Sequence, residues 1–280
     1  MKSAAGGAIL AVLALACLAA PLLAPDGPAA ATAGAFEAPS AAHWLGTNGQ
    51  GQDVFAQLVW GGRGSLLMAL SVGVGTTLVA VLVGLLAAYF GGLADEAISL
   101  VVNIVLTVPG LPLIIVLAAF LPPGPATIAM VLIITGWAFG ARLIRAQALS
   151  LRQRDFIAAA KVAGERPLRV IAAELLPNLW SVIAAYLCGQ VVFALTAGSA
   201  LEFLGLGDAG QTSWGTMLFW AQNDSALLQG AWWTFVSPGL AIALTAGSLA
   251  LLNFALDAAT NPRLRAPGGA RRATEVLRHG

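Results

Sequence analysis

The sequence predicts an all-α, polytopic membrane protein, and three observations support this fold class. Of the 280 residues, 59% are hydrophobic and 10% are charged, with a mean hydropathy of +0.85, whereas soluble domains carry about 25% charged residues. Six apolar stretches approach the roughly 20 residues with which a helix crosses the hydrocarbon core. The basic residues between them fall almost entirely on one side. This pattern excludes a cytosolic enzyme, a secreted disulfide scaffold and a disordered chain.

Six transmembrane helices are expected, at residues 6–24, 66–90, 98–121, 125–141, 179–202 and 233–256. Glu202, at the end of the fifth, is the single acidic or basic residue within these limits. Glycines along the spans permit close helix contact, and Gly136 and Gly140 have the four-residue spacing of a packing face. The glycine-rich stretch 61–65 is interpreted as a flexible lead-in to the second span.

The first stretch has a second interpretation, a cleaved signal peptide, because Lys2 and an apolar run precede Ala19-Ala20-Pro21. The run is longer than the 7–15 residues of a usual signal core. Its removal would also leave an odd number of spans, in conflict with the charge distribution. We therefore expect a retained helix.

Basic residues predict the orientation. Lys2, the segment 142–178 and the tail after residue 257 together hold 13 of the 14 Lys and Arg residues, and Arg63 is the other. Because basic residues are retained on the cytoplasmic side, both termini are expected there. The expected organisation is an N-terminal transmembrane helix (1–25), an external segment (26–65), a five-helix core (66–257) containing the cytoplasmic segment 142–178, and a cytoplasmic tail (258–280).

The sequence offers few residues for catalysis. Cys17 and Cys188 lie far apart within apolar stretches, and the two histidines are His43 and His279. No metal-ligand spacing and no phosphate-binding G-x-x-x-x-G-K-[ST] loop is present. Ion-coupled transporters generally carry ionisable groups within their spans, whereas the expected spans of this chain hold no acidic or basic residue except Glu202 at the very end of the fifth. We expect no catalytic, metal-binding or cofactor-binding residue, and a partner that supplies energy.

The segment 142–178 predicts a short helix over 156–163. Asp155 can cap it, and Gly164 can supply a left-handed stop. Phe156, Ala159, Ala160 and Ala163 share one side of this helix, where the alanines allow another protein to approach closely. Pro167 lies near the start of a second helical stretch, which Pro177 is expected to end. A solvated connector is the alternative, but it does not explain an alanine-rich helix with a glycine stop.

This segment resembles the EAA motif, E-A-A-x-x-x-G followed by nine residues and I-x-L-P, of permease subunits of binding-protein-dependent ABC importers. Ala159, Ala160 and Gly164 match the motif, and Leu176-Pro177 falls at the required distance. Ala158 stands in place of the motif's glutamate, and Glu174 in place of its isoleucine.

Three further stretches resemble the C-type permease subunits of the dipeptide/oligopeptide/nickel branch. The first is similar to H-x-L-G-T-D…G-R-D…G-x-R-x-S-L and supplies Gly46, Thr47, Asp53, Gly61 and Arg63, but Asn48 and Gln52 replace an aspartate and an arginine. The second, similar to F-L-G-L-G…W-G-x-M-L, supplies Gly205, Gly207, Trp214 and Gly215. The third is the closing segment, with Trp232-Trp233, Pro238-Gly239, Asn253, Asp257 and 262–265. The resemblance runs from about residue 43 to 265.

The resemblance implies a type I ABC importer permease fold in the inner membrane of a prokaryote. It implies a second permease subunit in a heterodimer, ATP-binding subunits and an extracytoplasmic solute-binding protein, with membrane lipid around the chain and no nucleic acid. In this family the helix near 156–163 is the coupling helix. Phe156 would be its apolar anchor, Ala159 and Ala160 its close-approach face, and Gly164 its turn.

Peptides are the solute that this branch implies by default, with nickel or another non-peptide solute as the alternative. An ATP-independent secondary transporter and a non-transporting membrane scaffold are further alternatives. Trp44, Trp214 and Trp220 lie in the expected external segments. They are interpreted either as anchors at the membrane interface or as a docking surface for the binding protein, and we favour anchors.

Overall fold

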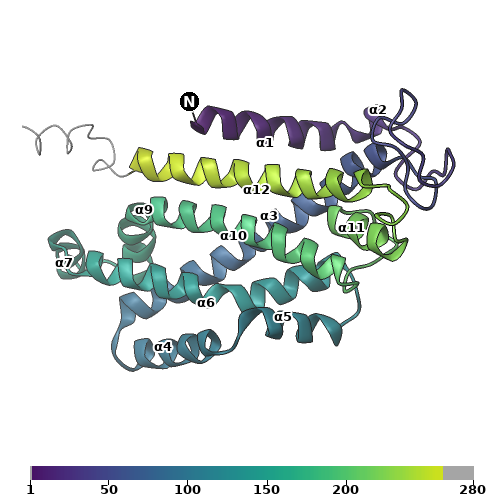
Figure 1. Ribbon diagram of the computed structural model, residues 1–280. Coiled ribbons are helices and arrows are strands. Elements are labelled where there is room, and N and C mark those ends of the chain that lie inside the picture. The colour runs from purple at the N-terminus through teal and green to yellow at the C-terminus, as the bar shows by residue number, and fades with distance from the viewer. Residues whose placement is uncertain (1, 261–280) are drawn as a thin grey trace, which may run out of the picture.

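The computed structural model describes residues 2–260, without the side chains of 2–4, 161 and 255–260. This part of the chain consists of helices and connecting loops, and its extended pairing is limited to two isolated β-bridges, Ala31 with Gln52 and Thr47 with Asp53. The long helices lie side by side between two ends (Figure 1). We call the end from which α7 protrudes the α7 end. The opposite end, formed by residues 24–53 and 204–232, is the loop end.

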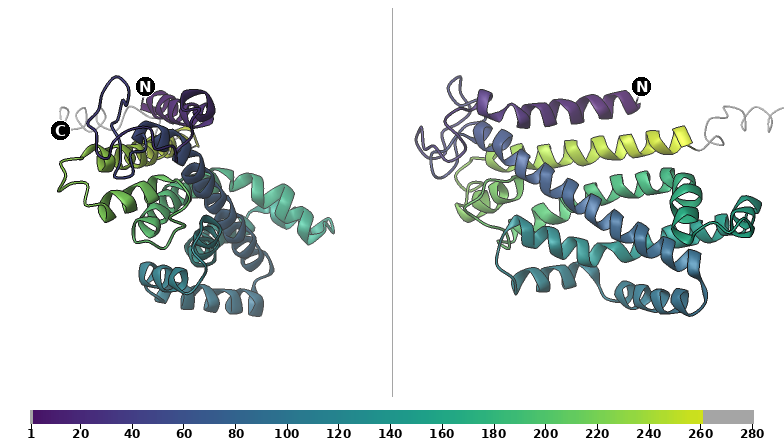
Figure 2. Two further views of the ribbon diagram at one scale, coloured as in Figure 1. Left: turned by 90° about the vertical axis from the view of Figure 1, so that its right-hand side faces the viewer. Right: turned by 180° about the vertical axis from the view of Figure 1, so that it is seen from behind.

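The helices have the following bounds: α1 Lys2–Leu18, α2 Ala20–Leu23, α3 Val54–Phe90, α4 Gly92–Thr107, α5 Gly110–Ala119, α6 Pro125–Arg152, α7 Asp155–Val162, α8 Pro167–Arg169, the π-helix η1 Val170–Leu175, α9 Leu176–Asn178, α10 Trp180–Phe203, α11 Trp214–Asn223 and α12 Trp233–Thr260. The beginning of α1 and the end of α12 both lie toward the α7 end (Figures 1 and 2). The two helices pack against each other.

Four helices of the described residues are long and apolar enough to cross a membrane, namely α3, α6, α10 and α12. The pair α4–α5 makes a fifth if it is counted as one bent span. The apolar part of α1, Ala5–Leu18, is shorter than a typical span. The structure therefore confirms a polytopic helical bundle, and the first of the six expected spans does not reach full length by itself.

The second expected span begins earlier than predicted. The Asp53 carboxylate accepts a hydrogen bond from the Ala56 amide at 3.0 Å, and this N-cap starts α3 at Val54 instead of 66. Residues 61–65 consequently lie inside a helix of 37 residues that crosses the bundle obliquely (Figure 2). A Cβ atom at Gly62 would collide with Cys17 Sγ and the Trp214 ring. The interpretation of 61–65 as a flexible lead-in was wrong, because these glycines allow close packing.

The third expected span, 98–121, is broken. The axes of α4 and α5 differ by 83°, and the break falls at Val108 and Pro109. Val108 is extended, with ψ of 131°, the conformation that a following proline favours. Pro109 also lacks the amide that would continue the helical hydrogen bonds. The prediction of one uninterrupted helix was wrong here.

Among the described residues, the two largest of four buried apolar clusters connect most of the long helices. The larger involves α3, α6, α10, α11 and α12 toward the loop end. The second joins the last turns of α3 and α6 to α7, η1 and α10 at the α7 end. Gly136 and Gly140 confirm the expected packing face, because the Tyr186 hydroxyl donates to the Gly136 carbonyl at 3.1 Å and its ring occupies the space beside Gly140.

Candidate functional site

Helix α7 begins at Asp155 and ends at Val162, close to the predicted 156–163. Asp155 lies in its first turn, where a carboxylate stabilises the positive end of the helix dipole. Gly164 has φ of +77°, which confirms the predicted left-handed stop. The Glu165 amide donates to the Ala160 carbonyl at 3.1 Å and closes this turn.

Two side chains of α7 pack against the bundle. Ile157 is fully buried in the cluster at the α7 end, and Ala160 packs against the same cluster. An isolated helix of eight residues is unstable in water, so the position of α7 depends on these contacts. The cluster also includes Tyr89 of α3, Ile144 of α6 and Val170 of η1, and α7 contacts α6 and η1 directly.

The exposed side of α7 differs in part from the predicted one. Phe156 is 39% exposed, and Ala159 and Ala163 are also exposed, as expected. Ala160 instead turns toward the bundle. Val162, which sequence reasoning missed, is 90% exposed. Its signal was present in the sequence, because an apolar side chain three residues after Ala159 lies on the same side of a helix.

The chain after α7 departs from the expected proline stop. Pro167 lies in the first turn of α8, as predicted. Pro177 does not end the stretch, because it lies in the first turn of α9 and α10 follows at once. The wider turns of η1 precede it, and a π-helical turn suits a proline that cannot donate a hydrogen bond. Leu176 packs against the cluster and Pro177 is exposed.

Arginines of α6 connect helices instead of lying free in a solvated connector. Arg145 forms a two-pronged ion pair with Asp95 of α4, in which Nη2 lies 2.6 Å from Oδ2. Arg142 donates to Asn103 Oδ1 at 2.7 Å, and Arg152 donates to the Ala88 carbonyl at 3.0 Å. Sequence reasoning missed these ties, although the predicted topology placed Asp95 at the same end as the arginines.

At the loop end, the stretch 43–53 folds onto α3 and α12. Thr47 is fully buried, donates to the Gly34 carbonyl at 2.7 Å and accepts from the Glu37 amide at 2.8 Å. Its carbonyl accepts from Trp233 Nε1 at 3.1 Å. Gly46 has φ of +69°, and a Cβ there would press on the Glu37 carbonyl and the Trp233 indole. Gly46 and Thr47 thus shape this loop.

Asn48 and Gln52, which depart from the family motif, contact each other. Asn48 Nδ2 donates to Gln52 Oε1 at 2.9 Å, and Asn48 Oδ1 accepts from the Gln52 amide at 2.9 Å. Gln57 Nε2 donates to the same Gln52 oxygen at 2.6 Å. The two residues that depart from the motif are therefore in direct contact, and the contact between them is neutral.

The second loop-end motif folds around Glu202. This carboxylate is 6% exposed and accepts a hydrogen bond from the Ser213 hydroxyl at 2.7 Å. Cβ atoms at Gly207 or Gly215 would collide with the Glu202 side chain. Gly205 has φ of +82° and turns the chain after α10. These three glycines are explained by packing and backbone shape.

The tryptophans divide into two groups. Trp214 is 1% exposed, and its indole donates to the Leu58 carbonyl at 2.9 Å, so both the anchor and the docking interpretation were wrong for it. Trp44 is 66% exposed and Trp220 is partly exposed.

Arg63 is exposed, with its guanidinium carbon 5.1 Å from the centre of the Trp60 ring. The sequence motif at Arg63 therefore contributes a cation–π contact.

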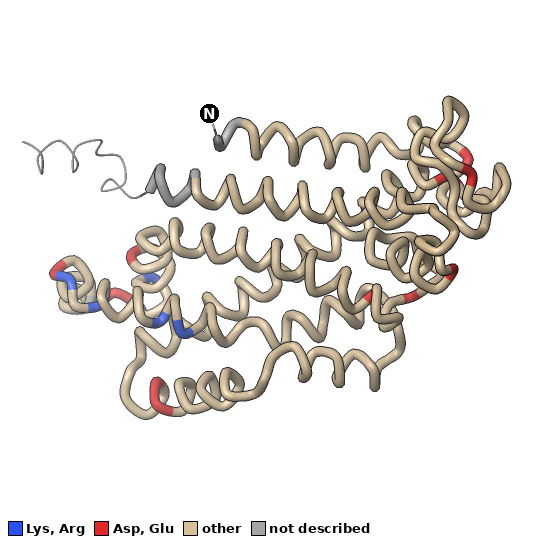
Figure 3. Tube along the Cα trace, viewed as in Figure 1, with Lys and Arg blue, Asp and Glu red and all other residues tan. Residues whose placement is uncertain are grey.

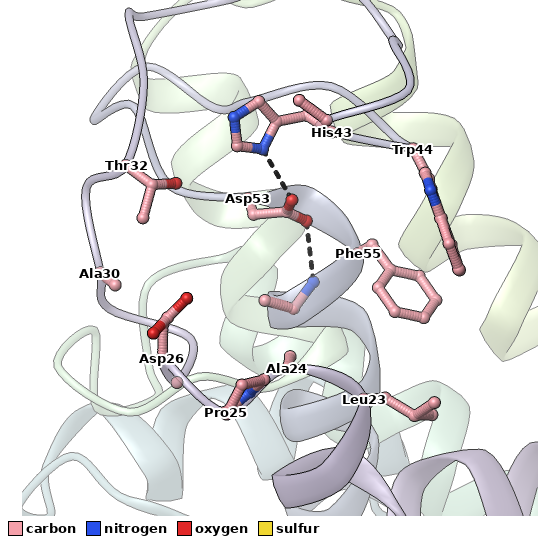
Figure 4. A pocket seen from close by; sticks show the side chains of 13 residues that line it. Leu23, Ala24, Pro25, Asp26, Ala30, Thr32, His43, Trp44, Asp53 and Phe55 are labelled. Carbon is pink, nitrogen blue, oxygen red and sulfur yellow. Dashed lines mark hydrogen bonds and ion pairs between the residues drawn. The ribbon is translucent and has the colours of Figure 1, made fainter.

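A cavity of about 330 Å³ opens beside the start of α3 (Figure 4). Asp26 and Asp53 line it, together with the aromatic rings of Trp44 and Phe55, whose centres lie 5.1 Å apart. His43 Nδ1 lies 2.8 Å from Asp53 Oδ2. Elsewhere at this end, burial raises the pKa of Asp224, whose carboxylate lies against Gly49.

In the part of the chain that the structure describes, basic residues gather at the α7 end, whereas acidic residues lie at both ends of the bundle (Figure 3). Among the described residues no group of three or more His, Cys, Asp or Glu side chains could hold a metal ion. The Asp257 side chain, His279 and the residues 261–280, including the expected motif at 262–265, lie outside the described residues.

The fold defines a class of protein, a polytopic helical membrane bundle, and one short, partly exposed helix, α7, protrudes from one end of it. The model of the family described as binding-protein-dependent transport system inner membrane component matches residues 80–266. The chain belongs to this family. The match includes α7 and the segment that follows it.

Named relatives agree with this assignment. The chain is 35% identical to the dipeptide transport system permease protein DppC of Bacillus subtilis, over 81% of this chain and 71% of that protein. It is 36% identical to a putative peptide permease protein of Brucella suis, over 81% of this chain and 75% of that protein. It is 32% identical to the oligopeptide transport system permease protein OppC of Mycobacterium bovis, over 75% of this chain and 72% of that protein.

Proposed function

We propose that this chain is the C-type permease subunit of an ATP-driven importer that carries peptides across the cytoplasmic membrane. The observation that supports this most directly is the family match over 80–266, which contains an exposed, alanine-rich α7 attached to the bundle. The relatives named as dipeptide, oligopeptide or peptide permeases support peptides as the solute.

The α7 end is proposed to face the cytoplasm, with both termini on that side. Of the basic residues, Arg142, Arg145, Arg152, Arg154, Arg166 and Arg169 lie from α6 to α8. Arg63 lies near the loop end. The positive-inside rule then orients the bundle. The loop end faces outward, where a solute-binding protein would deliver the solute to a path shared with a second permease subunit.

Helix α7 is proposed to be the lever between an ATP-binding subunit and the bundle. Phe156, Ala159, Val162 and Ala163 form its exposed surface, which would enter a groove on that subunit. In this proposal Ile157, which is buried in the cluster at the α7 end, would pass the movement to α6 and η1, the elements that α7 contacts. Coupling requires that the docked subunit favour one arrangement of the bundle over another. ATP hydrolysis would then occur in the ATP-binding subunits, and this chain would form part of the translocation path for the solute.

Uptake of a labelled dipeptide into membrane vesicles tests this function. Gly164→Pro forces φ to about −65° where the structure has +77°, so it redirects α7. We expect insertion of the variant into the membrane to be preserved and ATP-dependent uptake to be lost. Leu228→Ala, at an 88% exposed position of the loop end, is the control and should transport normally. Normal uptake by Gly164→Pro, or uptake by the parent chain without ATP-binding subunits, would contradict the proposal.

A further inference from the structure

A cavity of about 250 Å³ lies between α3, α4 and α6, apart from the exposed side of α7. Gly84 of α3, Ser99 and Asn103 of α4, and Arg142 and Arg145 of α6 line it. A Cβ atom at Gly84 would lie 2.8 Å from the Ala141 carbonyl, so the helices approach closely on one side of the cavity. Two arginines thus line one opening between three helices.

The two arginines differ in how their charge is balanced. Arg145 is paired with Asp95. Arg142 is exposed and donates to the neutral Asn103 oxygen at 2.7 Å. Among the described residues, no carboxylate lies within ion-pair distance of Arg142. Because a guanidinium has five N–H donors, Arg142 retains both a positive charge and free donors at the cavity.

The position of Arg142 along α6 places it near a membrane boundary. It follows Pro125, the first residue of α6, by 17 residues, which corresponds to about 26 Å of helix, close to the roughly 30 Å of a hydrocarbon core. Toward the membrane centre the surface becomes apolar. Phe139, one turn from Arg142, is 60% exposed, and Leu106, one turn beyond Asn103, is 36% exposed.

We propose that this cavity binds an anionic phospholipid, whose phosphate pairs with Arg142 and whose acyl chain covers Phe139 and Leu106. Basic pockets between transmembrane helices on the cytoplasmic side are suited to anionic headgroups, and arginine can bind a phosphate through two parallel hydrogen bonds. The lipid would join α4 to α6 just before the break at Pro109. The inference depends on the bundle lying in a membrane, and it is independent of the transported solute.

Lipid-dependent thermal stability tests the proposal. The intact chain, purified in detergent with the subunits that accompany it, is titrated with dioleoyl phosphatidylglycerol, with zwitterionic dioleoyl phosphatidylcholine, or with inorganic phosphate. Arg142→Gln is compared with Arg166→Gln, a control at an exposed position of the same end. We expect phosphatidylglycerol to raise Tm for the parent and the control, and its half-saturating concentration to rise at least tenfold for Arg142→Gln. Equal responses of all three chains, or protection by inorganic phosphate that matches phosphatidylglycerol, would overturn the proposal.

A second measurement needs no variant of Arg142. Photoactivatable phosphatidylglycerol is cross-linked to the parent chain, and the labelled peptides are identified by mass spectrometry. Labels on α4 and α6 around Leu106 and Phe139 support the site. Labels that avoid both helices, or cross-linking of this face to a second permease subunit, would overturn it.

Discussion

Replacement of Phe156 by alanine tests the docking side of α7. Phe156 is 39% exposed. A phenylalanine side chain has an accessible surface of about 200 Å², so about 80 Å² remains for a partner to cover. At about 25 cal/mol per Å², burial of this area contributes about 2 kcal/mol to binding, or roughly 25-fold in Kd. We expect Phe156→Ala to weaken association with the ATP-binding subunits by about this factor.

The assay compares binding with the local stability of α7. The affinity of the detergent-solubilised chain for the ATP-binding subunits is measured by surface plasmon resonance with one partner immobilised. Amide hydrogen exchange reports the local stability of α7. Because Ile157 remains buried, exchange in α7 should be unchanged in Phe156→Ala. Leu228→Ala, at the loop end, should bind normally. If Phe156→Ala binds the ATP-binding subunits with a Kd within twofold of the parent, Phe156 does not contribute to docking. An equal loss of affinity in Leu228→Ala would also contradict docking at α7.

Three further predictions concern other contacts. Ile157→Ala removes a fully buried side chain, which lowers the free energy of unfolding by about 2–5 kcal/mol. We therefore expect faster amide hydrogen exchange in α7 and lower uptake per ATP hydrolysed. Unchanged exchange would show that Ile157 does not hold the helix. At Gly164, a Cβ atom would meet no other atom within 4 Å, so alanine should cost only about 1–2 kcal/mol of backbone strain and asparagine less. Uptake should therefore fall in the order Gly, Asn, Ala. An alanine variant more active than the asparagine variant would contradict this. Asn48→Asp removes the hydrogen-bond donor to Gln52 and should lower Tm, whereas adding Gln52→Arg should restore Tm. A double-mutant cycle in detergent should give a coupling free energy above about 1 kcal/mol between positions 48 and 52. Strictly additive effects would show that the two positions are not coupled.

Local composition and spacing were sufficient for much of the fold. Apolar length identified α3, α6, α10 and α12 because hydrocarbon thickness sets a minimum helix length. Gly164 was predictable as a stop, since glycine tolerates positive φ at little steric cost. The break at Pro109 also had a local signal, which apolar length concealed.

Other features depended on contacts between distant parts of the chain. Whether Ile157 or Phe156 faces the bundle depends on where α3 and η1 lie, and eight residues cannot specify this. The Arg145–Asp95 pair joins residues 50 positions apart. Trp214 resembled a surface aromatic in the sequence, yet its indole is buried against α3 through the Leu58 carbonyl. Burial of such residues follows from the assembled bundle.

We propose above that an ATP-binding subunit contacts this chain at α7, on the cytoplasmic side. It is tested most directly by thiol cross-linking from Val162→Cys in a Cys188→Ala background, in which Cys17 is only 4% exposed. Trp44→Cys, at a 66% exposed position of the loop end, is the matched control. We expect Val162→Cys to react with an impermeant thiol reagent only in inside-out vesicles and to cross-link to an ATP-binding subunit. We expect Trp44→Cys to react only in right-side-out vesicles. The reverse labelling pattern, or cross-linking to that subunit from Trp44→Cys alone, would contradict it.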